Sequence, residues 1–190
     1  MCLEEQKTTL RVAAQEKRYR TAREIGEKAA TRIADHLVSG FGSQSGCVVS
    51  GYLAIGSEID VLPALYELEA CNLRAALPVV LRDGEPLIFR RWRQGLKLES
   101  GPLRTRHPAA SSPEMKPDLL IIPLLAFDAE GYRIGWGGGF YDRTLIKLRA
   151  EKSVTAVGAA FSSQQVDKVP REDHDARLDW VVTEAGLTHF

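Results

Sequence analysis

One glycine-rich segment, residues 133–145 (RIGWGGGFYDRTL), constrains the fold more than any other stretch of the chain. It follows residues 118–127 (DLLIIPLLAF), whose apolar core at 119–122 has the length of a strand buried on both faces. Leu145 and Leu148 then recur at helical spacing. The glycines are therefore predicted to connect a buried strand to a helix.

Glycine has a specific use at such a connection, because without a Cβ the backbone can take positive φ and bring amide N–H groups close to a ligand. Together with the positive end of the following helix, those amides can bind phosphate. The segment lacks the Lys-Ser/Thr ending of a P-loop, and Phe140 stands where the dinucleotide fingerprint has its third glycine. A purely structural turn is the alternative. Arg133 and Asp142 favour phosphate and magnesium, since phosphate binds cations and magnesium binds carboxylates.

The rest of the chain alternates between helix and strand signals. Residues 4–38, rich in Ala, Glu, Lys and Arg, predict one long or two consecutive helices ended by Gly40 and Gly42. A helix is predicted at 61–71 with Asp60 as its N-cap and Pro63 in its first turn. Residues 95–117 hold several prolines and predict an irregular surface loop. Further strands are predicted at 47–54, 75–81, 87–92, 154–161 and 180–183, with 87–92 as an antiparallel partner of 75–81.

This alternation predicts a single domain over residues 1–190, a three-layer α/β/α fold with long N-terminal helices. Its mostly parallel sheet would be Rossmann-like and related to the sugar-phosphate isomerase and CoA-transferase type. Ligands of such sheets gather at the carboxyl ends of the strands. Glu58, the glycine segment, Gln164 and Asp175 are expected to meet there.

Charge and cysteine content narrow the class of protein. Lys and Arg together number 25, as do Asp and Glu, so no general affinity for nucleic acid or membrane is indicated and any anion site must be local. The three cysteines, Cys2, Cys47 and Cys71, form no Cys-x-x-Cys pair, which is typical of reduced thiols. No apolar signal core or membrane-spanning stretch occurs. We expect a soluble cytoplasmic protein, a monomer or a homodimer.

The candidate site residues form the inventory of a magnesium ATP site. Phosphoryl transfer needs mainly charge neutralisation, for which Lys7, Arg11 and Arg133 supply cations, the glycine amides supply donors, and Asp142 and Asp175 supply hard oxygen ligands. Alternatively, Lys7 and Arg11 lie on a solvated helix face, and Trp136, Phe140 and Tyr141 are core or hinge packing. Catalytic zinc and a Ser-His-Asp triad are disfavoured, since His-Glu-x-x-His, paired cysteines and Gly-x-Ser-x-Gly do not occur.

These residues resemble the 5-formyltetrahydrofolate cyclo-ligases, also called 5,10-methenyltetrahydrofolate synthetases. The central match is residues 118–142, an Asp-apolar-Pro run followed by Ala126-Phe127-Asp128, Gly131, Arg133-Ile-Gly135 and Gly137-Gly-Gly-Phe-Tyr-Asp142. Flanking matches occur in the correct order: Lys7-x-x-x-Arg11, Tyr52 with Glu58-Ile-Asp60, Phe161-x-x-Gln164, and Pro170 with His174-Asp175 and Asp179.

The resemblance implies conversion of 5-formyltetrahydrofolate and ATP to 5,10-methenyltetrahydrofolate, ADP and phosphate through a phosphorylated imidate. It implies catalytic roles for Lys7, Arg11 and Arg133 and a magnesium site at Asp142 and Asp175. The folate site would comprise Leu53, Glu58, Trp136, Phe140 and Tyr141. ATP would contact Lys7, Arg11, Arg133, Ile134, Gly135, Trp136, Gly137, Gly138, Gly139, Phe140, Tyr141 and Gln164.

Two departures and two rival functions accompany this resemblance. Trp136 stands where the family often has a smaller aromatic or a basic residue, and residues 103–109 (LRTRHPA) replace a Gly-Ile-x-Glu-Pro turn. Arg104, Arg106 and His107 are candidate contacts for a polyglutamate tail of the substrate. A non-catalytic sensor of a sugar phosphate or nucleotide would use the same kind of sheet. A sugar-phosphate isomerase would too, but without dependence on ATP.

Overall fold

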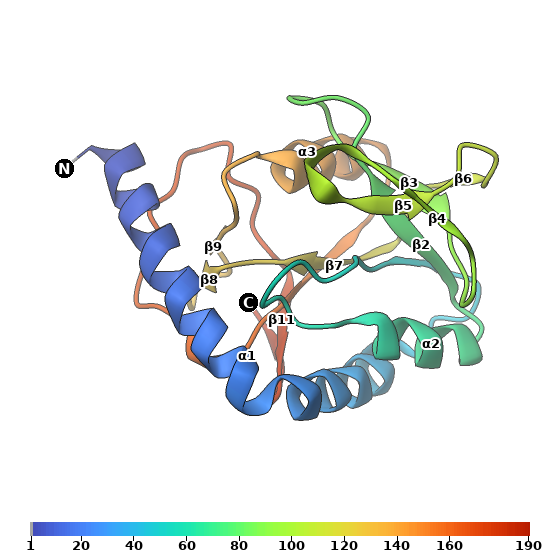
Figure 1. Cartoon of the computed structure of the whole chain (residues 1–190), viewed down its shortest axis with the longest axis horizontal. Coiled ribbons are helices and arrows are strands. Elements are labelled where there is room, and N and C mark those ends of the chain that lie inside the picture. Colours follow the sequence, from blue (N-terminus) through green and yellow to red (C-terminus); the bar gives the residue numbers. More distant parts are fainter. Residues whose placement is uncertain (1) are drawn as a thin grey trace.

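A single eight-stranded sheet runs through the middle of the protein (Figure 1). The computed structural model describes residues 2–190, apart from the side chain of Arg104. Strands β11, β10, β7, β1 and β2 are mutually parallel, and β12, β3 and β6 add antiparallel pairings at the two ends. In spatial order the strands are β12 (Gly186–His189), β11 (Trp180–Thr183), β10 (Thr155–Ala159), β7 (Leu119–Pro123), β1 (Val48–Ser50), β2 (Arg74–Val79), β3 (Ile88–Arg91) and β6 (Glu114–Met115).

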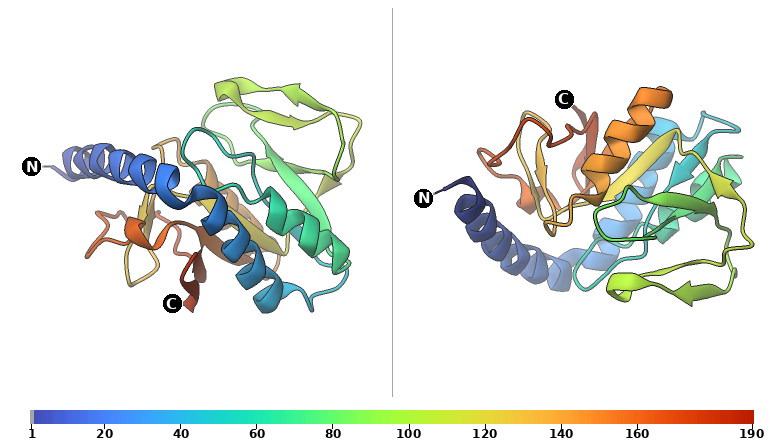
Figure 2. Two further views of the ribbon diagram at one scale, coloured as in Figure 1. Left: turned by 60° about the horizontal axis from the view of Figure 1, so that its bottom comes forward. Right: turned by 90° about the horizontal axis from the view of Figure 1, so that it is seen from above.

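Helices cover both faces of this sheet (Figures 1 and 2). Helices α1 (Leu3–Phe41) and α2 (Leu62–Ala70) lie on one face and α3 (Phe140–Glu151) on the other. Strand β7 explains the arrangement, because successive side chains of a strand point to opposite faces. Leu119 and Ile121 enter the core under α1 and α2, whereas Leu120 and Ile122 enter the core under α3. The predicted three-layer α/β/α fold with a mostly parallel sheet is confirmed.

Helix α1 is one continuous element of 39 residues. It is bent, so that its first half runs past the edge of the sheet while its second half lies against the sheet and α2 (Figures 1 and 2). The second half packs through Ile33 and Leu37, which are fully buried. The buried residues of the first half include the charged Lys7 and Arg18. Among residues 2–190, no helix combines the length and the low polarity that a membrane crossing requires.

Residues 95–117 were predicted as an irregular loop, and that prediction is wrong. Strands β4 (Leu98–Ser100) and β5 (Arg106–Pro108) form an antiparallel ribbon with the short 3-10 helix Pro102–Arg104 between them, and β6 joins the main sheet. Strands of two or three residues are too short to show a repeating apolar pattern. The C-terminal strand β12, Gly186–His189, was also not predicted, because it carries only one large apolar residue, Leu187.

Two local boundaries also differ from expectation. The strand predicted at 47–54 is confined to β1, because the chain turns into a loop after Ser50. Helix α2 has Val61 as its N-cap rather than Asp60. The Asp60 carboxylate nevertheless accepts a hydrogen bond from the Leu62 N–H at 3.0 Å, which satisfies one of the free donors at the helix start.

Candidate active site

The glycine segment reaches the carboxyl end of the sheet through a small ribbon, β8 (Ala126–Phe127) paired with β9 (Arg133–Ile134). Asp128 organises the turn of this ribbon from a fully buried position. Its Oδ1 accepts hydrogen bonds from the N–H groups of Glu130 and Tyr132, each at 3.0 Å, and its Oδ2 accepts one from Val169 at 3.0 Å. Asp128 therefore supports the loop that carries Arg133 and the glycines.

The glycines are required by the backbone conformation between β9 and α3. Gly137 has φ of 99° and Gly139 has φ of 64°, and side chains disfavour this left-handed region. A Cβ at Gly137 would lie 3.3 Å from Cζ of Arg11, so the loop backbone packs closely against that guanidinium. Gly139 is the N-cap of α3, which leaves free amides and the positive helix end at the loop.

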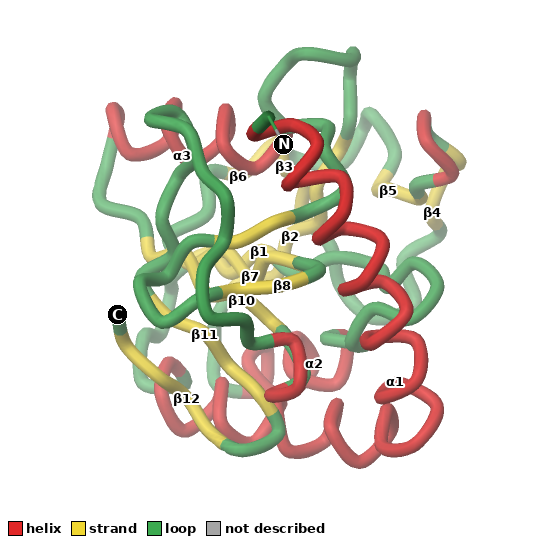
Figure 3. Tube along the Cα trace, turned by 90° about the vertical axis from the view of Figure 1, so that its left-hand side faces the viewer, coloured by secondary structure: helices red, strands yellow, loops and turns green. Residues whose placement is uncertain are grey.

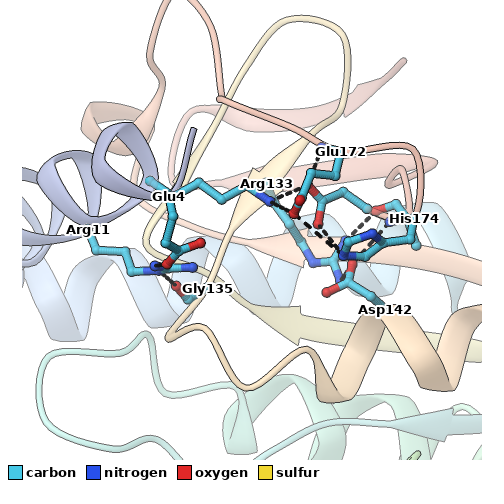
Figure 4. Close-up of polar contacts among 10 residues, drawn as sticks. Glu4, Arg11, Arg133, Gly135, Asp142, Glu172 and His174 are labelled. Carbon is cyan, nitrogen blue, oxygen red and sulfur yellow. Dashed lines mark hydrogen bonds and ion pairs between the residues drawn. The ribbon is translucent and has the colours of Figure 1, made fainter. Parts of the chain in front are cut away.

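Arg11 on α1 contacts this loop directly (Figure 4). Its Nε donates to the carbonyl oxygen of Gly135 at 3.3 Å, and its Nη1 pairs with Glu4 at 3.0 Å. Arg11 therefore links the first half of α1 to the glycine segment across 124 residues of sequence. The carboxylate of Glu4 is mostly exposed, so an incoming anion could replace it.

Arg133 and Asp142 form an ion pair at the other end of the segment. The Arg133 Nη2 lies 2.9 Å from Oδ1 of Asp142, and its Nη1 donates to the carbonyl oxygen of Ala176. The same Asp142 oxygen accepts the N–H of Ala176 at 3.0 Å. These bonds tie the backbone of Ala176, the neighbour of Asp175, to Arg133 and Asp142, and a magnesium site shared by Asp142 and Asp175 stays a prediction.

Lys7 joins the first half of α1 to the same C-terminal segment. Its Nζ lies 2.7 Å from Oδ2 of Asp175 and 2.9 Å from Oε2 of Glu172. Burial lowers the pKa of Lys7, but hydrogen bonds to both carboxylates outweigh that effect and leave the pKa raised. Burial also raises the pKa of Asp175, but the bond from Lys7, the bond from the Glu172 N–H and the charge of Lys7 together outweigh burial, so the pKa is lowered. Both shifts favour the charged pair.

The side chains that could hold a magnesium ion here are carboxylates. Asp142 and Asp175 offer hard carboxylate oxygens of the kind that magnesium prefers. Ligand atoms of Glu172, His174 and Asp175 lie within 4.8 Å of one another, and Figure 4 shows Glu172 and His174 of this group. Lys7 and Arg133 hold the Asp175 and Asp142 carboxylates at present, so a bound cation would compete with these ion pairs.

A second group of side chains lies on the folate side of the predicted site. The Trp136 indole N–H donates to Oε1 of Glu58 at 3.1 Å, and the Ile55 N–H donates to its Oε2 at 2.9 Å. The Trp136 side chain remains exposed, at 56%. Leu53 packs against the core as a partly buried residue. The structure thus brings Glu58 and the glycine segment together, as predicted.

Two tyrosines adjoin the Glu58 carboxylate. Tyr52 is buried, at 4% exposure, and its hydroxyl has no hydrogen-bond partner among the described residues. Burial, followed by the charge of Glu58, raises the pKa of Tyr52 well above its usual value. The same causes, in the same order, raise the pKa of Tyr141. Both phenols are therefore neutral at physiological pH.

Two of the predicted ATP contacts occupy positions that limit how they could bind a ligand. The Ile134 side chain is buried in a core cluster, so only its backbone could contact a ligand. The Gln164 amide donates to the carbonyl oxygens of Leu124 and Leu125, each at 2.9 Å, and accepts the Phe161 N–H at 2.7 Å. Gln164 therefore braces the end of β7, and its contact with ATP stays a prediction.

The remaining candidate residues are Phe140, at the start of α3, and the residues of strand β5. Phe140 is half-buried, with the Arg143 guanidinium 5.3 Å from its ring centroid. Arg106 is exposed and His107 half-buried on strand β5, beside β3 at the far end of the sheet from α1 (Figure 1). The side chain of Arg104 lies outside the described residues. A polyglutamate contact at this ribbon stays a prediction.

Sequence reasoning missed Arg18, which is 2% exposed and reaches Glu58 and Trp136. The helical spacing of Arg18 from Lys7 and Arg11 could have identified it. Lys7, Arg11, Ala14 and Arg18 are spaced at i, i+4, i+7 and i+11, which places them on one face of a helix.

The sequence and the fold both match known proteins. The profile of the 5-formyltetrahydrofolate cyclo-ligase family matches residues 3–184. The 5-formyltetrahydrofolate cyclo-ligase of Escherichia coli K12 is 34% identical over 165 residues, which cover 84% of this chain and 88% of that protein. A 5,10-methenyltetrahydrofolate synthetase of Aquifex aeolicus superposes with a TM-score of 0.74 at 27% identity, covering 96% of this chain and 92% of that one. The Mycoplasma pneumoniae enzyme of the same name has a TM-score of 0.75 at 23% identity, with coverages of 94% and 98%.

Proposed function

Because the chain belongs to the 5-formyltetrahydrofolate cyclo-ligase family, we propose that it cyclises 5-formyltetrahydrofolate to 5,10-methenyltetrahydrofolate at the expense of ATP. One observation supports this most directly. The adjacent residues Gly135 and Trp136 contact Arg11 on one side and Glu58 on the other. A phosphate-binding cation and a carboxylate suited to a folate ring therefore meet at a single loop.

The nucleotide side of the proposal uses the cations around the loop. Lys7, Arg11 and Arg133 would bind the phosphates of ATP together with the amides at the start of α3. For Lys7 and Arg11 this means exchanging the carboxylates of Glu172 and Glu4 for phosphate oxygens. Magnesium, when held by Asp142 and Asp175, would neutralise charge on the transferring phosphoryl group.

The folate side uses groups that suit a flat, hydrogen-bonding ring. The Glu58 carboxylate would accept N–H donors of the pterin in place of the Trp136 indole. The exposed Trp136 ring offers an aromatic face, and Leu53, Phe140 and Tyr141 complete the proposed lining. No buried charge is left unpaired when such a donor takes the place of the indole.

The proposed reaction has two steps. The formyl oxygen attacks the γ-phosphorus of ATP and ADP leaves, which gives a phosphorylated imidate. Nitrogen 10 then attacks the imidate carbon, loses its proton and expels phosphate as the ring closes. Both nitrogens belong to one substrate, so the protein has only to hold them in line and stabilise charge. No side chain is needed as a nucleophile.

The proposal is tested by near-ultraviolet absorbance with 5-formyltetrahydrofolate and magnesium, before and after ATP is added. We expect a methenyl band that appears only with ATP. Asp142→Asn should lower kcat/KM on the order of 100-fold, because a metal ligand and the partner of Arg133 are lost together. The exposed Asp173→Asn serves as the matched control and should leave turnover unchanged.

A different pattern would favour the sensor alternative. If the folded wild-type protein forms no methenyl product and Asp142→Asn retains or gains affinity for anions, the cyclo-ligase proposal is overturned. Turnover without ATP would point instead to an isomerase.

A further inference from the structure

We infer that Arg18 is a positioning residue that holds Glu58 and Trp136 in the arrangement that binds the folate substrate. The inference rests on the proposed function, because it takes these two residues as folate contacts. Arg18 lies on the same face of α1 as Lys7 and Arg11, but it reaches the other side of the glycine segment. It is not proposed to touch the reacting atoms.

The contacts of Arg18 join separate parts of the chain. Its Nε donates to Oγ of Ser57 at 3.1 Å, and its Nη1 donates to the carbonyl oxygen of Leu124 at 3.2 Å. The same Nη1 lies 3.8 Å from Oε1 of Glu58. Its Cζ lies 5.3 Å from the ring centroid of Trp136. The Arg18 guanidinium thus contacts three separate segments: the turn that carries Glu58, the end of β7 and the glycine segment.

Arg18 and Glu58 carry opposite charges that are buried together. The Arg18 and Glu58 side chains are both almost fully buried, at 3% and 5% exposure. Burial lowers the pKa of Arg18, an effect that the charge of Glu58 opposes. Burying a carboxylate is costly unless it is paired, so Arg18 helps to stabilise the buried Glu58 carboxylate to which a pterin N–H would donate.

The shape of the guanidinium matters as much as its charge. Its planar fork donates to Ser57 and Leu124 while its Cζ lies over the Trp136 ring. A lysine ammonium could retain attraction to Glu58 but could not make this set of contacts together. Arg18→Lys should therefore fall between the wild type and Arg18→Gln in every measurement below.

The first measurement follows the indole N–H signals in a proton–nitrogen NMR spectrum of the full chain. Trp136 is assigned among the three tryptophans by its loss in Trp136→Phe. In Arg18→Gln we expect the Trp136 signal to shift or broaden, because its bond to Glu58 loosens, while the Trp92 and Trp180 signals stay in place. The matched control is Arg20→Gln, an exposed arginine of the same helix, which should change none of them.

The second measurement separates positioning from a merely structural role. Titration with 5-formyltetrahydrofolate in the absence of ATP should give a Kd raised about 10-fold or more in Arg18→Gln. At saturating ATP the KM for this substrate should rise similarly while kcat stays within about 3-fold. Loss of folded protein alone would instead lower the apparent kcat and leave KM unchanged. If Arg18→Gln does not fold, the same Kd and KM measurements on Arg18→Lys replace it.

The outcomes separate the two claims. If the wild type binds and turns over the substrate, but folded Arg18 variants show wild-type Kd, KM and Trp136 signal, the positioning role is overturned and the proposed function stands. If the wild type neither binds nor converts 5-formyltetrahydrofolate, the proposed function fails and the role assigned to Arg18 fails with it.

Discussion

At the residue scale, the hydroxyl of Tyr52 is the most unusual group near the site. It is buried beside Glu58 without a hydrogen-bond partner among the described residues. A buried hydroxyl left unsatisfied costs about 1–3 kcal/mol relative to one that is hydrogen-bonded. Such a cost is common where a ligand or an ordered water later supplies the missing bond.

Replacement of Tyr52 by phenylalanine should therefore stabilise the free protein by about 1 kcal/mol. The ring that packs in the core is retained, and only the unpaired hydroxyl is lost. Urea unfolding of the ligand-free chain measures the change. Tyr19→Phe, at an exposed position on α1, is the control and should be neutral. A loss of stability in Tyr52→Phe would mean that the hydroxyl is hydrogen-bonded in solution.

At the element scale, Asp118 links the start of β1 to the residue that follows α3. Its Oδ2 accepts the Val48 N–H at the start of β1 at 2.7 Å, and its Oδ1 pairs with Lys152 just after α3. Burial raises the pKa of Asp118, but the bond from Lys152 and then that from Val48 outweigh it, so the pKa is lowered. This carboxylate therefore stabilises the fold in its ionised form.

The sign of this shift gives a pH-dependent prediction. Because the folded pKa lies below the ordinary value of 3.8, the contribution is present above that value and is lost as pH falls through the folded pKa. Asp118→Asn should cost about 1 kcal/mol at pH 7 and less at pH 3, where the carboxylate begins to be protonated. Urea unfolding at pH 7, 5 and 3 measures this, with the exposed Asp83→Asn as control. A difference independent of pH would contradict the prediction.

At the scale of the whole molecule, the candidate site is formed where a segment near the N-terminus lies beside a segment near the C-terminus. Lys7 reaches Asp175 across 168 residues, and the first half of α1 stands beside the loops that precede β11 (Figure 3). The buried residues of this half are Lys7, Ala14 and Arg18, and its apolar contacts come mainly from Ala14 and the partly buried Leu10. Its order should therefore depend on ion pairs, and regions held in this way open more readily than a packed core.

Lys7→Met tests that dependence without reference to turnover. Amide hydrogen exchange in residues 3–17 should quicken about 5- to 10-fold, because Glu172 and Asp175 lose their common partner. The second half of α1, packed through Ile33 and Leu37, should exchange as before. Mass spectrometry of peptic peptides measures both halves, and Lys17→Met on the same half is the control. Unchanged exchange at residues 3–17 would show that other contacts hold the helix.

The sequence by itself determined the architecture of the central layers. The apolar run of β7, the glycines at positive φ and the helix that follows are neighbours along the chain, and their patterns reflect local backbone geometry. Motifs around the glycine segment likewise indicated the family. Strands such as β4, β5 and β12 were beyond this reasoning, because short edge strands depend on which partner lies beside them.

Only the tertiary structure decided how the site residues pair. The Arg18 guanidinium lies next to the Glu58 carboxylate, and Asp142 forms an ion pair with Arg133. The Gln164 side-chain amide donates a hydrogen bond to the backbone carbonyl of Leu124 at the end of β7. Sequence patterns identify residues with the right chemistry, but hydrogen bonds and ion pairs act over a few ångströms. The bend of α1 and the return of the C-terminal segment bring distant residues within that range, and no local pattern in the chain encodes those distances.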